Sequence, residues 1–320
     1  MKVVLYHDHC QDGFFSAYLA WKYFQEEDAK FISVSHRPVL DLDPLESLSF
    51  ILQQQNITIE DCIDSDLFVF DFCFPENFLR EFSKVFKSVL VLDHHQTCFD
   101  ELKKRNKYTI SDKGWLKFQI ADNVEVYFSN EESSAKLVYR HFYKNSSVPW
   151  YIELVSDHDL GKNSFNDTNN FYHGITLYKP YEFKTIDYLV ETDFKDIIEL
   201  GQLVERNRLN IVKEIAQNLV TIDLVHQGIS YKGAIVNTDL SNASDVGNYI
   251  LFYVKQHDFC LLYNIKNNKV AYCSIRSIHT FNSLIISEKF NGGGHKTSGG
   301  FGINLTDLFE ILNNNFLLIE

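Results

Sequence analysis

The most informative segment of the sequence is Val89-Leu90-Val91-Leu92-Asp93-His94-His95-Gln96-Thr97. Its four leading residues are apolar, which is typical of a strand buried on both faces of a parallel sheet. The polar triplet Asp93-His94-His95 comes where this strand is expected to end. Ligands and catalytic groups collect at the carboxyl ends of strands in open α/β sheets, so we expect the triplet to face a crevice. The alternative is a turn in which Asp93 caps the next helix and both imidazoles lie in solvent.

Two other segments repeat this pattern of an apolar run that ends in an imidazole or a carboxylate. They are Val3-Val4-Leu5-Tyr6-His7 and Leu67-Phe68-Val69-Phe70-Asp71. The carboxyl ends of parallel strands meet at one edge of a sheet, so three strands would bring their polar residues to one place. The sequence therefore predicts an α/β fold with a doubly wound parallel sheet.

The first strand is followed by a polar turn and then a helix. The turn is His7-Asp8-His9-Cys10-Gln11-Asp12-Gly13, and apolar positions 14, 17, 18, 21 and 24 after it share one helical face. Gly13 permits a tight turn, and the exposed amides at a helix start can bind anionic groups. Asp12-Gly13 could also be an ordinary turn with no ligand.

A second acidic cluster follows a later apolar run. Residues 150–160 end in Ser156-Asp157-His158-Asp159-Leu160, which could equally be a helix end without a ligand. A long polar helical pattern then covers residues 189–218, and such a helix usually connects domains. Beyond it, apolar segments at 220–224, 233–237, 259–263 and 270–276 are expected to form a mixed sheet in a second, smaller α/β domain.

Composition limits the classes of function. A chain of 320 residues with 45% hydrophobic residues, including 27 Phe and 17 Tyr, is long enough for two domains with a core each. A formal net charge of −13 argues against a protein that grips long duplex nucleic acid, which requires a basic surface. The six cysteines lack Cys-x-x-Cys spacing and the chain opens with a strand, so we expect a reduced, cytoplasmic protein. No apolar run approaches the roughly 18 residues that cross a bilayer, so no membrane partner is expected.

These motifs together resemble the DHH phosphoesterases, which include RecJ-type nucleases, oligoribonucleases and cyclic-dinucleotide phosphodiesterases. The resemblance rests on the Asp93-His94-His95 triplet, on the motif from His7 to Asp12-Gly13, and on Asp71. Near the other end, residues 292–301, Gly-Gly-Gly-His-Lys-Thr-Ser-Gly-Gly-Phe, resemble the Gly-Gly-His signature of the DHHA1 domain. The predicted organisation is a DHH domain at 1–200, a connecting helix at 201–222 and a DHHA1-like domain at 223–320.

The resemblance implies a centre with two divalent cations. Cleaving a phosphodiester requires an oxygen nucleophile at neutral pH and neutralisation of the phosphoryl charge, and two cations supply both. The implied metal ligands, with Asp71 as the bridge, are His7, Asp12, Asp71, His94 and Asp157. Asp159 is the alternative to Asp157, because the sequence does not fix which side chain faces the crevice. Imidazole and carboxylate ligands together favour Mn²⁺ over Mg²⁺.

The Asp93-His94-His95 triplet is implied to be catalytic, with Asp93 and His95 orienting the ligands or facing the phosphate. One departure from the family concerns the first motif, which usually carries a further aspartate before Asp-Gly. Here the residues are His9-Cys10-Gln11-Asp12. Cys10 could be a softer ligand, Asp8 could substitute, or the first metal could be weakly held. Cys10 could also be an inert buried thiol.

In the second domain, the implied substrate-binding residues are Gly293, Gly294, His295 and Arg276. The glycines allow close approach of the backbone to a ligand, and His295 can donate to a phosphate oxygen. A guanidinium binds phosphate through two parallel hydrogen bonds, and the family uses an arginine at the position of Arg276. The alternative for Arg276 is a surface arginine at a strand end.

We therefore expect a phosphoesterase, similar to an exoribonuclease, that acts on short oligonucleotides or linear dinucleotides. A cyclic-dinucleotide phosphodiesterase, a 3′-phosphoadenosine 5′-phosphate phosphatase and a pyrophosphatase-like activity stay open, as does a homodimer. The alternative from another class is a non-catalytic nucleotide-binding protein with an impaired metal site, which only the Cys10 departure supports.

Overall fold

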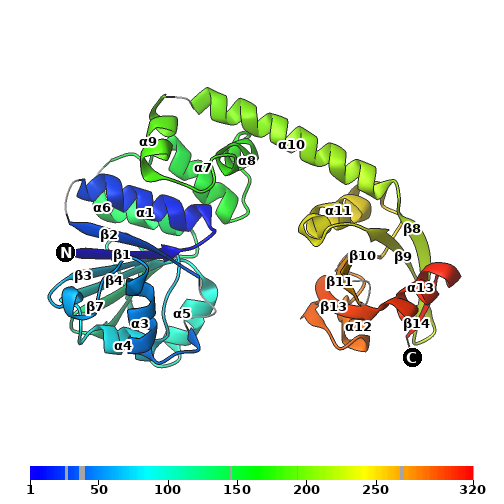
Figure 1. Ribbon diagram of the computed structural model, residues 1–320, viewed down its shortest axis with the longest axis horizontal. Coiled ribbons are helices and arrows are strands. Elements are labelled where there is room, and N and C mark those ends of the chain that lie inside the picture. The colour runs from blue at the N-terminus through cyan, green and yellow to red at the C-terminus, as the bar shows by residue number, and fades with distance from the viewer. Residues whose placement is uncertain (26–27, 36–39, 145, 193, 267–269, 320) are drawn as a thin grey trace. The chain divides into compact units, whose positions relative to one another are not determined.

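The computed structural model describes the chain except for residues 26–27, 36–39, 145, 193, 267–269 and 320. The described residues form two compact units, Met1–Glu205 and Arg206–Glu320. The division falls within one long helix, α10 (Phe194–Ala216) (Figure 1). The connecting helix was predicted at 201–222, but the chain is already a strand at Val220. The β-branched pair Val220-Thr221, with Ile222 after it, favours a strand over a further helical turn.

The first unit is built on a seven-stranded sheet with the order β2-β1-β3-β4-β7-β6-β5. The strands are β1 (Lys2–His7), β2 (Ala29–Val34), β3 (Asp66–Phe70), β4 (Ser88–Asp93), β5 (Tyr108–Ile110), β6 (Leu116–Ala121) and β7 (Val124–Phe128). The five strands from β2 to β7 pair in parallel, and β6 and β5 extend the sheet in antiparallel fashion. In β4, Val91 and Leu92 are fully buried, as the apolar run predicted.

Helices cover both faces of this sheet, as Figure 1 shows for α1 and α6 on one face and for α3, α4 and α5 on the other. The helices of the first unit are α1 (Gln11–Phe24), α3 (Pro44–Gln53), the short 3₁₀ turn Glu60–Cys62, α4 (Glu76–Phe82), α5 (Gln96–Lys103), α6 (Ser134–Phe142), α7 (Trp150–Asp159), α8 (Thr168–Thr176), α9 (Phe183–Thr192) and the start of α10. Each face has its own apolar core. Phe15 and Tyr18 of α1 belong to one core, and Ile51 of α3 and Phe82 of α4 belong to the other. The predicted doubly wound parallel sheet is confirmed.

The strand order fixes where a ligand site can form. From β1 the chain passes to β2 on one side and later returns to β3 on the other side. The carboxyl ends of β1 and β3 therefore flank the point at which the winding direction reverses. In doubly wound sheets the helices diverge at this switch point and leave a crevice above the strand ends. His7 ends β1 and Asp71 follows β3, so the winding places both at this crevice.

The second unit holds a mixed seven-stranded sheet with the order β12-β13-β11-β10-β9-β8-β14. Its strands are β8 (Val220–His226), β9 (Ile229–Asn237), β10 (Phe259–Lys266), β11 (Val270–Ser277), β12 (Gly293–His295), β13 (Ser298–Asn304) and β14 (Phe316–Ile319). Its helices are the 3₁₀ turn Leu240–Asn242, α11 (Ala243–Tyr249), the π-helical turn Ile250–Val254, α12 (Leu284–Lys289) and α13 (Leu305–Asn314). The pairs β9–β10 and β8–β14 are parallel and the other pairs are antiparallel, so the mixed sheet expected in the smaller second domain is confirmed.

Candidate metal centre

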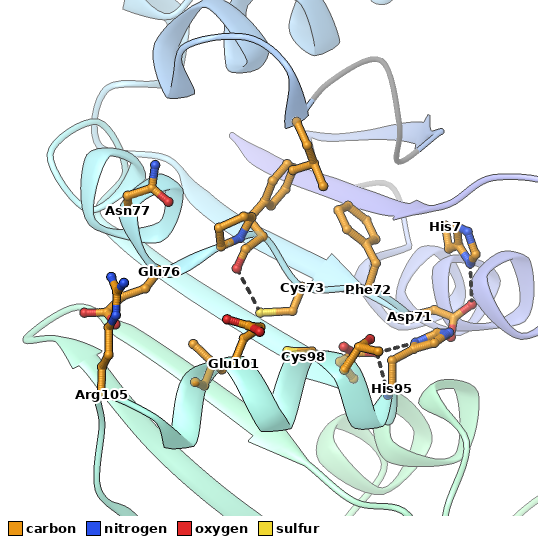
Figure 2. Close-up of a pocket in the computed structure, with 16 residues that line it drawn as sticks. His7, Asp71, Phe72, Cys73, Glu76, Asn77, His95, Cys98, Glu101 and Arg105 are labelled. Atoms are coloured by element: carbon orange, nitrogen blue, oxygen red, sulfur yellow. Dashed lines mark hydrogen bonds and ion pairs between the residues drawn. The ribbon is translucent and has the colours of Figure 1, made fainter. Parts of the chain in front are cut away.

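Two residues of the site lie at the carboxyl ends of neighbouring strands. The Nδ1 atom of His7, at the end of β1, lies 3.4 Å from Oδ2 of Asp71, just beyond β3 (Figure 2). The Asp71 side chain is fully buried, and its backbone has a φ of +65°. A positive φ is uncommon for a residue other than glycine and is often found at functional sites. An extended residue at this position would continue the strand. The positive φ of Asp71 instead turns the backbone and directs the carboxylate toward the crevice.

Asp12 and Gly13 bring the start of α1 against the same two residues. Asp12 is buried, and its carboxylate accepts hydrogen bonds from the backbone amides of Ser134 at 2.7 Å and Ala135 at 3.0 Å, in the first turn of α6. Gly13 passes so close to β1 that a Cβ there would lie 2.5 Å from the His7 carbonyl oxygen and 3.1 Å from Oδ2 of Asp71. Only glycine allows this approach, which explains the Asp-Gly pair in physical terms.

The residues of the Asp93-His94-His95 triplet have two different roles. Oδ1 of Asp93 accepts hydrogen bonds from the backbone amides of His94 and His95 and lies 2.8 Å from Nδ1 of His95. Asp93 therefore fixes the turn and the orientation of the His95 ring. His94 points into the cluster, where its Nε2 lies 3.2 Å from Oδ1 of Asp71 and 3.8 Å from Oδ2 of Asp12.

The structure brings Asp159, the second choice, to the cluster, and it does not bring Asp157. Oδ2 of Asp159, at the end of α7, lies 3.1 Å from Nε2 of His94. The carboxylate of Asp157 instead accepts hydrogen bonds from the amides of Ser164 and Phe165 and from the hydroxyl of Thr168. Residues two apart on a helix point about 200° from each other, so only one of the pair can face the crevice. Of the two aspartates named as candidates, the structure therefore places Asp159, and not the preferred Asp157, at the cluster.

The donor atoms fit bound cations. Three groups among the described residues have donor atoms within 4.8 Å of one another: His7–Cys10–Asp71, Asp71–His94–His95 and Asp12–His94–Asp159. Asp71 links the first two groups, and His94 links the last two. Among the described residues, the buried atoms that lack a hydrogen bond include both carboxylate oxygens of Asp71, Nε2 of His94 and Oδ2 of Asp159. Buried polar atoms left without partners are rare, and their convergence here fits the coordination of metal ions.

The electrostatics of the cluster also fit the binding of cations. Burial, together with the neighbouring Asp71 and Asp159, holds the pKa of the Asp12 carboxyl well above its usual range. Burial alone would lower the pKa of His94, but the adjacent carboxylate of Asp71 and the charges of Asp12 and Asp159 raise it to about 9. Three carboxylates therefore share a buried site and draw positive charge onto the imidazole of His94. Divalent cations would supply that charge directly.

Two other candidates in the first motif have different surroundings. Cys10 precedes α1 and shares a donor group with His7 and Asp71. Burial and the nearby carboxylate of Asp71 raise the pKa of its thiol, so the neutral thiol is favoured when no cation is bound. Asp8 turns toward the exposed ring of His9, at 3.1 Å from its Nε2, and it belongs to none of the donor groups found among the described residues.

In the second unit, the register of the sheet places the predicted substrate-binding residues in one row. Arg276 on β11 is opposite Ser298 on β13, and Ser298 is opposite His295 on β12. The Arg276 guanidinium donates to the hydroxyls of Ser274 and Ser244 and to the carbonyl oxygen of Ile275. Gly293 and Gly294 precede His295 on β12, and Gly294 has a φ of +148°, a region that favours glycine.

Sequence reasoning missed a pocket that opens beside the metal cluster. It has a volume of about 620 Å³ and reaches from Asp71 and His95 to Glu101 and Arg105 (Figure 2). A signal for one wall exists in the sequence, because positions 95, 98, 102 and 105 recur at helical spacing. The opposite wall comes from the loop after β3, which sequence spacing does not relate to α5.

No helix in the described part of the chain combines the length and apolar character needed to cross a membrane. No protein-family model matches the sequence. A curated relative, the uncharacterized protein R106 of Acanthamoeba polyphaga mimivirus, is 25% identical over 312 residues, covering 94% of this chain and 67% of the relative.

Two solved structures are similar over nearly the whole chain. RecJ from Thermus thermophilus, crystallised in complex with Mn²⁺, has a TM-score of 0.43 at 12% identity, covering 98% of this chain and 51% of RecJ. PggH, a pGpG-specific phosphodiesterase from Vibrio cholerae, has a TM-score of 0.51 at 13% identity, covering 98% of this chain and 97% of PggH. The chain thus has the fold of the phosphodiesterase PggH over both of its units, in agreement with the DHH and DHHA1 resemblance of its motifs.

Proposed function

We propose that this chain is a metal-dependent phosphoesterase that hydrolyses phosphodiester bonds of short oligonucleotides or dinucleotides. The observation that carries the proposal is the buried carboxylate of Asp71. Its Oδ2 faces His7 at 3.4 Å and its Oδ1 faces His94 at 3.2 Å. A carboxylate with one oxygen directed at each of two donor groups is suited to bridge two cations.

The residues that would hold the cations are His7, Asp12, Asp71, His94 and Asp159, with Cys10 beside the first group. When bound, two divalent cations supply a water of lowered pKa and positive charge that stabilises the transferring phosphoryl group. The mixed imidazole and carboxylate donors favour Mn²⁺, as the sequence predicted. Without a cation, the carboxylates of Asp12, Asp71 and Asp159 repel one another when they are ionised. Bound cations would offset this repulsion, so that all three could be ionised together.

His95 has a separate role in this proposal. Its ring is 43% exposed at the mouth of the cluster, while Nδ1 is fixed by Asp93. The hydrogen bond that the His95 ring donates to Asp93 raises the pKa of His95, which favours the protonated ring. A positioned imidazolium can donate a hydrogen bond to a phosphate oxygen, and Asp93 keeps its orientation constant.

The second unit would hold another part of the substrate. The row of Arg276, Ser298 and His295 offers a guanidinium, a hydroxyl and an imidazole on adjacent strands. Such donors suit a phosphate or the end of a nucleotide. With a formal net charge of −13, the chain suits a short substrate held by local contacts rather than a long duplex.

The central test combines metal analysis with activity. Substituting Asp71→Asn keeps the size of the side chain but removes its charge, so we expect loss of metal content and of Mn²⁺-dependent hydrolysis together. Asp100→Asn, an exposed carboxylate paired with Lys103 on α5, is the matched control and is expected to retain both. An Asp71→Asn variant that keeps full metal content and activity would refute the bridging role.

The substrate is tested with a panel of linear dinucleotides, cyclic dinucleotides, 3′-phosphoadenosine 5′-phosphate and longer RNA and DNA, followed by product length. We expect the highest kcat/KM on linear dinucleotides or short oligonucleotides. A wild-type protein that binds Mn²⁺ but hydrolyses no member of this panel would contradict the proposed activity.

A further inference from the structure

The pocket beside the metal cluster is bounded by two segments far apart in the sequence. One wall is a face of α5 and its continuation, with His95, Cys98, Leu102 and Arg105. The other wall is the loop after β3 with the start of α4, from Phe72 to Asn77. Figure 2 shows His95, Cys98 and Glu101 along the helix, with Cys73 and Phe72 facing them. His7, Asp71 and Asp93 also line this pocket, so it is continuous with the metal cluster.

The size and lining of the pocket suit a flat heteroaromatic group. Its volume of about 620 Å³ lies within the range of about 300–1,000 Å³ that is usual for small-molecule sites. The middle of the pocket is lined by Phe72, Phe74, Pro75 and the thiol of Cys98. A hydrogen bond with Cys73 and burial raise the pKa of Cys98, so the thiol of Cys98 is neutral at neutral pH. The surface beside the cluster is therefore apolar and uncharged.

The far end of the pocket is polar and mainly acidic. Glu76, Asn77, Glu101 and Arg105 line it. The carboxylates of Glu76 and Glu101 pair with Arg80 and Lys104, and each retains further acceptor capacity. With Arg80 and Lys104 paired to them, Glu76 and Glu101 present carboxylate oxygens to the pocket, and these acceptors do not bind a second phosphate. They favour instead a neutral ring with adjacent N–H donors.

The geometry points to a nucleoside subsite in this pocket, for the nucleoside attached to the phosphate at the metal cluster. Its base lies between α5 and the loop after β3, and its N–H donors face Glu101 and Glu76. Guanine fits best among the common bases, because its N1–H and N2–H₂ donors are adjacent and match a carboxylate. This inference rests on the proposed function for the phosphate, but the subsite itself belongs to the first unit alone.

Guanosine is the probe that separates the two proposals, because it carries no phosphate and requires no metal. Its binding to the full-length protein is measured by saturation-transfer NMR and calorimetry with and without Mn²⁺. We expect wild-type binding under both conditions and at least tenfold weaker binding by Cys98→Phe, whose ring would fill the pocket from α5. Lys103→Phe places the same ring on α5 at a side chain that is 46% exposed and pairs with Asp100, outside the pocket, and it is expected to bind like the wild type.

A second variant covers the case in which Cys98→Phe does not fold. Glu101→Gln keeps the shape of an exposed side chain but replaces one acceptor oxygen with a donor. This variant should bind guanosine more weakly, and the ratio of its affinities for guanosine and uridine should be smaller than that of the wild type. Unchanged guanosine binding in both variants, or no guanosine binding by the wild type, would overturn the subsite while leaving metal-dependent hydrolysis intact. If the protein binds guanosine but hydrolyses no substrate of the panel, the proposed function is contradicted and the nucleoside subsite is supported.

Discussion

The Nε2 atom of His94 lies 3.1 Å from Oδ2 of Asp159, which joins the end of α7 to the residue that follows β4. This contact completes the donor group Asp12–His94–Asp159. It also assigns different roles to two acidic residues that are nearly adjacent in sequence. Asp159 faces the crevice, and Asp157 stabilises the loop between α7 and α8 through the amides of Ser164 and Phe165.

Substituting these two aspartates should have opposite consequences. We expect Asp159→Ala to reduce metal affinity by at least the roughly 10–100-fold that loss of an outer hydrogen-bonding partner costs, with little change in unfolding free energy without metal. Asp157→Ala should lower the unfolding free energy by about 1–2 kcal/mol, because three donors lose their acceptor, and folded protein should still bind metal. Urea unfolding and metal titration measure the two effects. The reverse pattern would restore Asp157 as the ligand.

Gly13→Ala tests the close approach of α1 to β1. The added Cβ would lie 2.5 Å from the His7 carbonyl oxygen, which belongs to the central part of the sheet and cannot move freely. We expect a loss of about 1–3 kcal/mol in unfolding free energy and weaker metal binding, because His7 and Asp71 must shift. In Gly302→Ala, on β13, the new Cβ would meet a carbon of Val270 at an ordinary 3.5 Å, so this control should be close to neutral. Equal stability of both variants would argue against a steric requirement at Gly13.

His141 should make the protein sensitive to mild acid. Burial, with the nearby charge of Lys113, lowers the pKa of His141 to about 4 in the folded state. The unfolded chain, with a pKa near 6.5, therefore binds more protons between these values. The contribution of His141 to the free energy of unfolding is fully present above a pH of about 6.5 and is lost as the pH falls toward about 4.

The measurement compares unfolding free energies of the wild type and His141→Gln at pH 7.5 and 4.5. We expect the wild type to lose more stability than His141→Gln over this interval, whatever the effect of other titrating groups on both proteins. Parallel losses would show that His141 accepts its proton as readily in the folded state as in the unfolded state.

Arg276→Ala tests the proposed role of the second unit. Removal of a charge-assisted hydrogen bond costs about 1.5–3 kcal/mol, so we expect KM for short oligonucleotides to rise about tenfold or more. Hydrolysis of a simple aryl phosphodiester should fall much less, because this substrate lacks the group that Arg276 would bind. Arg276→Lys should recover only part of the loss, since an ammonium cannot form two parallel hydrogen bonds. Similar losses on both substrates would contradict a role in substrate binding.

The parts of the site that follow strands can be predicted from the amino-acid pattern alone. Apolar runs before His7, Asp71 and Asp93 define buried strands, and buried parallel strands present their carboxyl ends together. The prediction of a crevice lined by these residues needed only the apolar pattern and the chirality of the fold. Asp12 and Gly13 were found for the same reason, because they begin the helix after the first strand.

Features that depend on how packed elements are rotated and how closely they approach become visible only in the folded protein. The choice between Asp157 and Asp159 depends on how α7 is rotated about its axis, and many weak packing contacts set that rotation. The pocket between α5 and the loop after β3 arises from two segments whose separation no local pattern encodes. Strand ends are fixed by a period of two and by chain direction, whereas the facing of a helix and the width of a cavity are properties of the whole packed core.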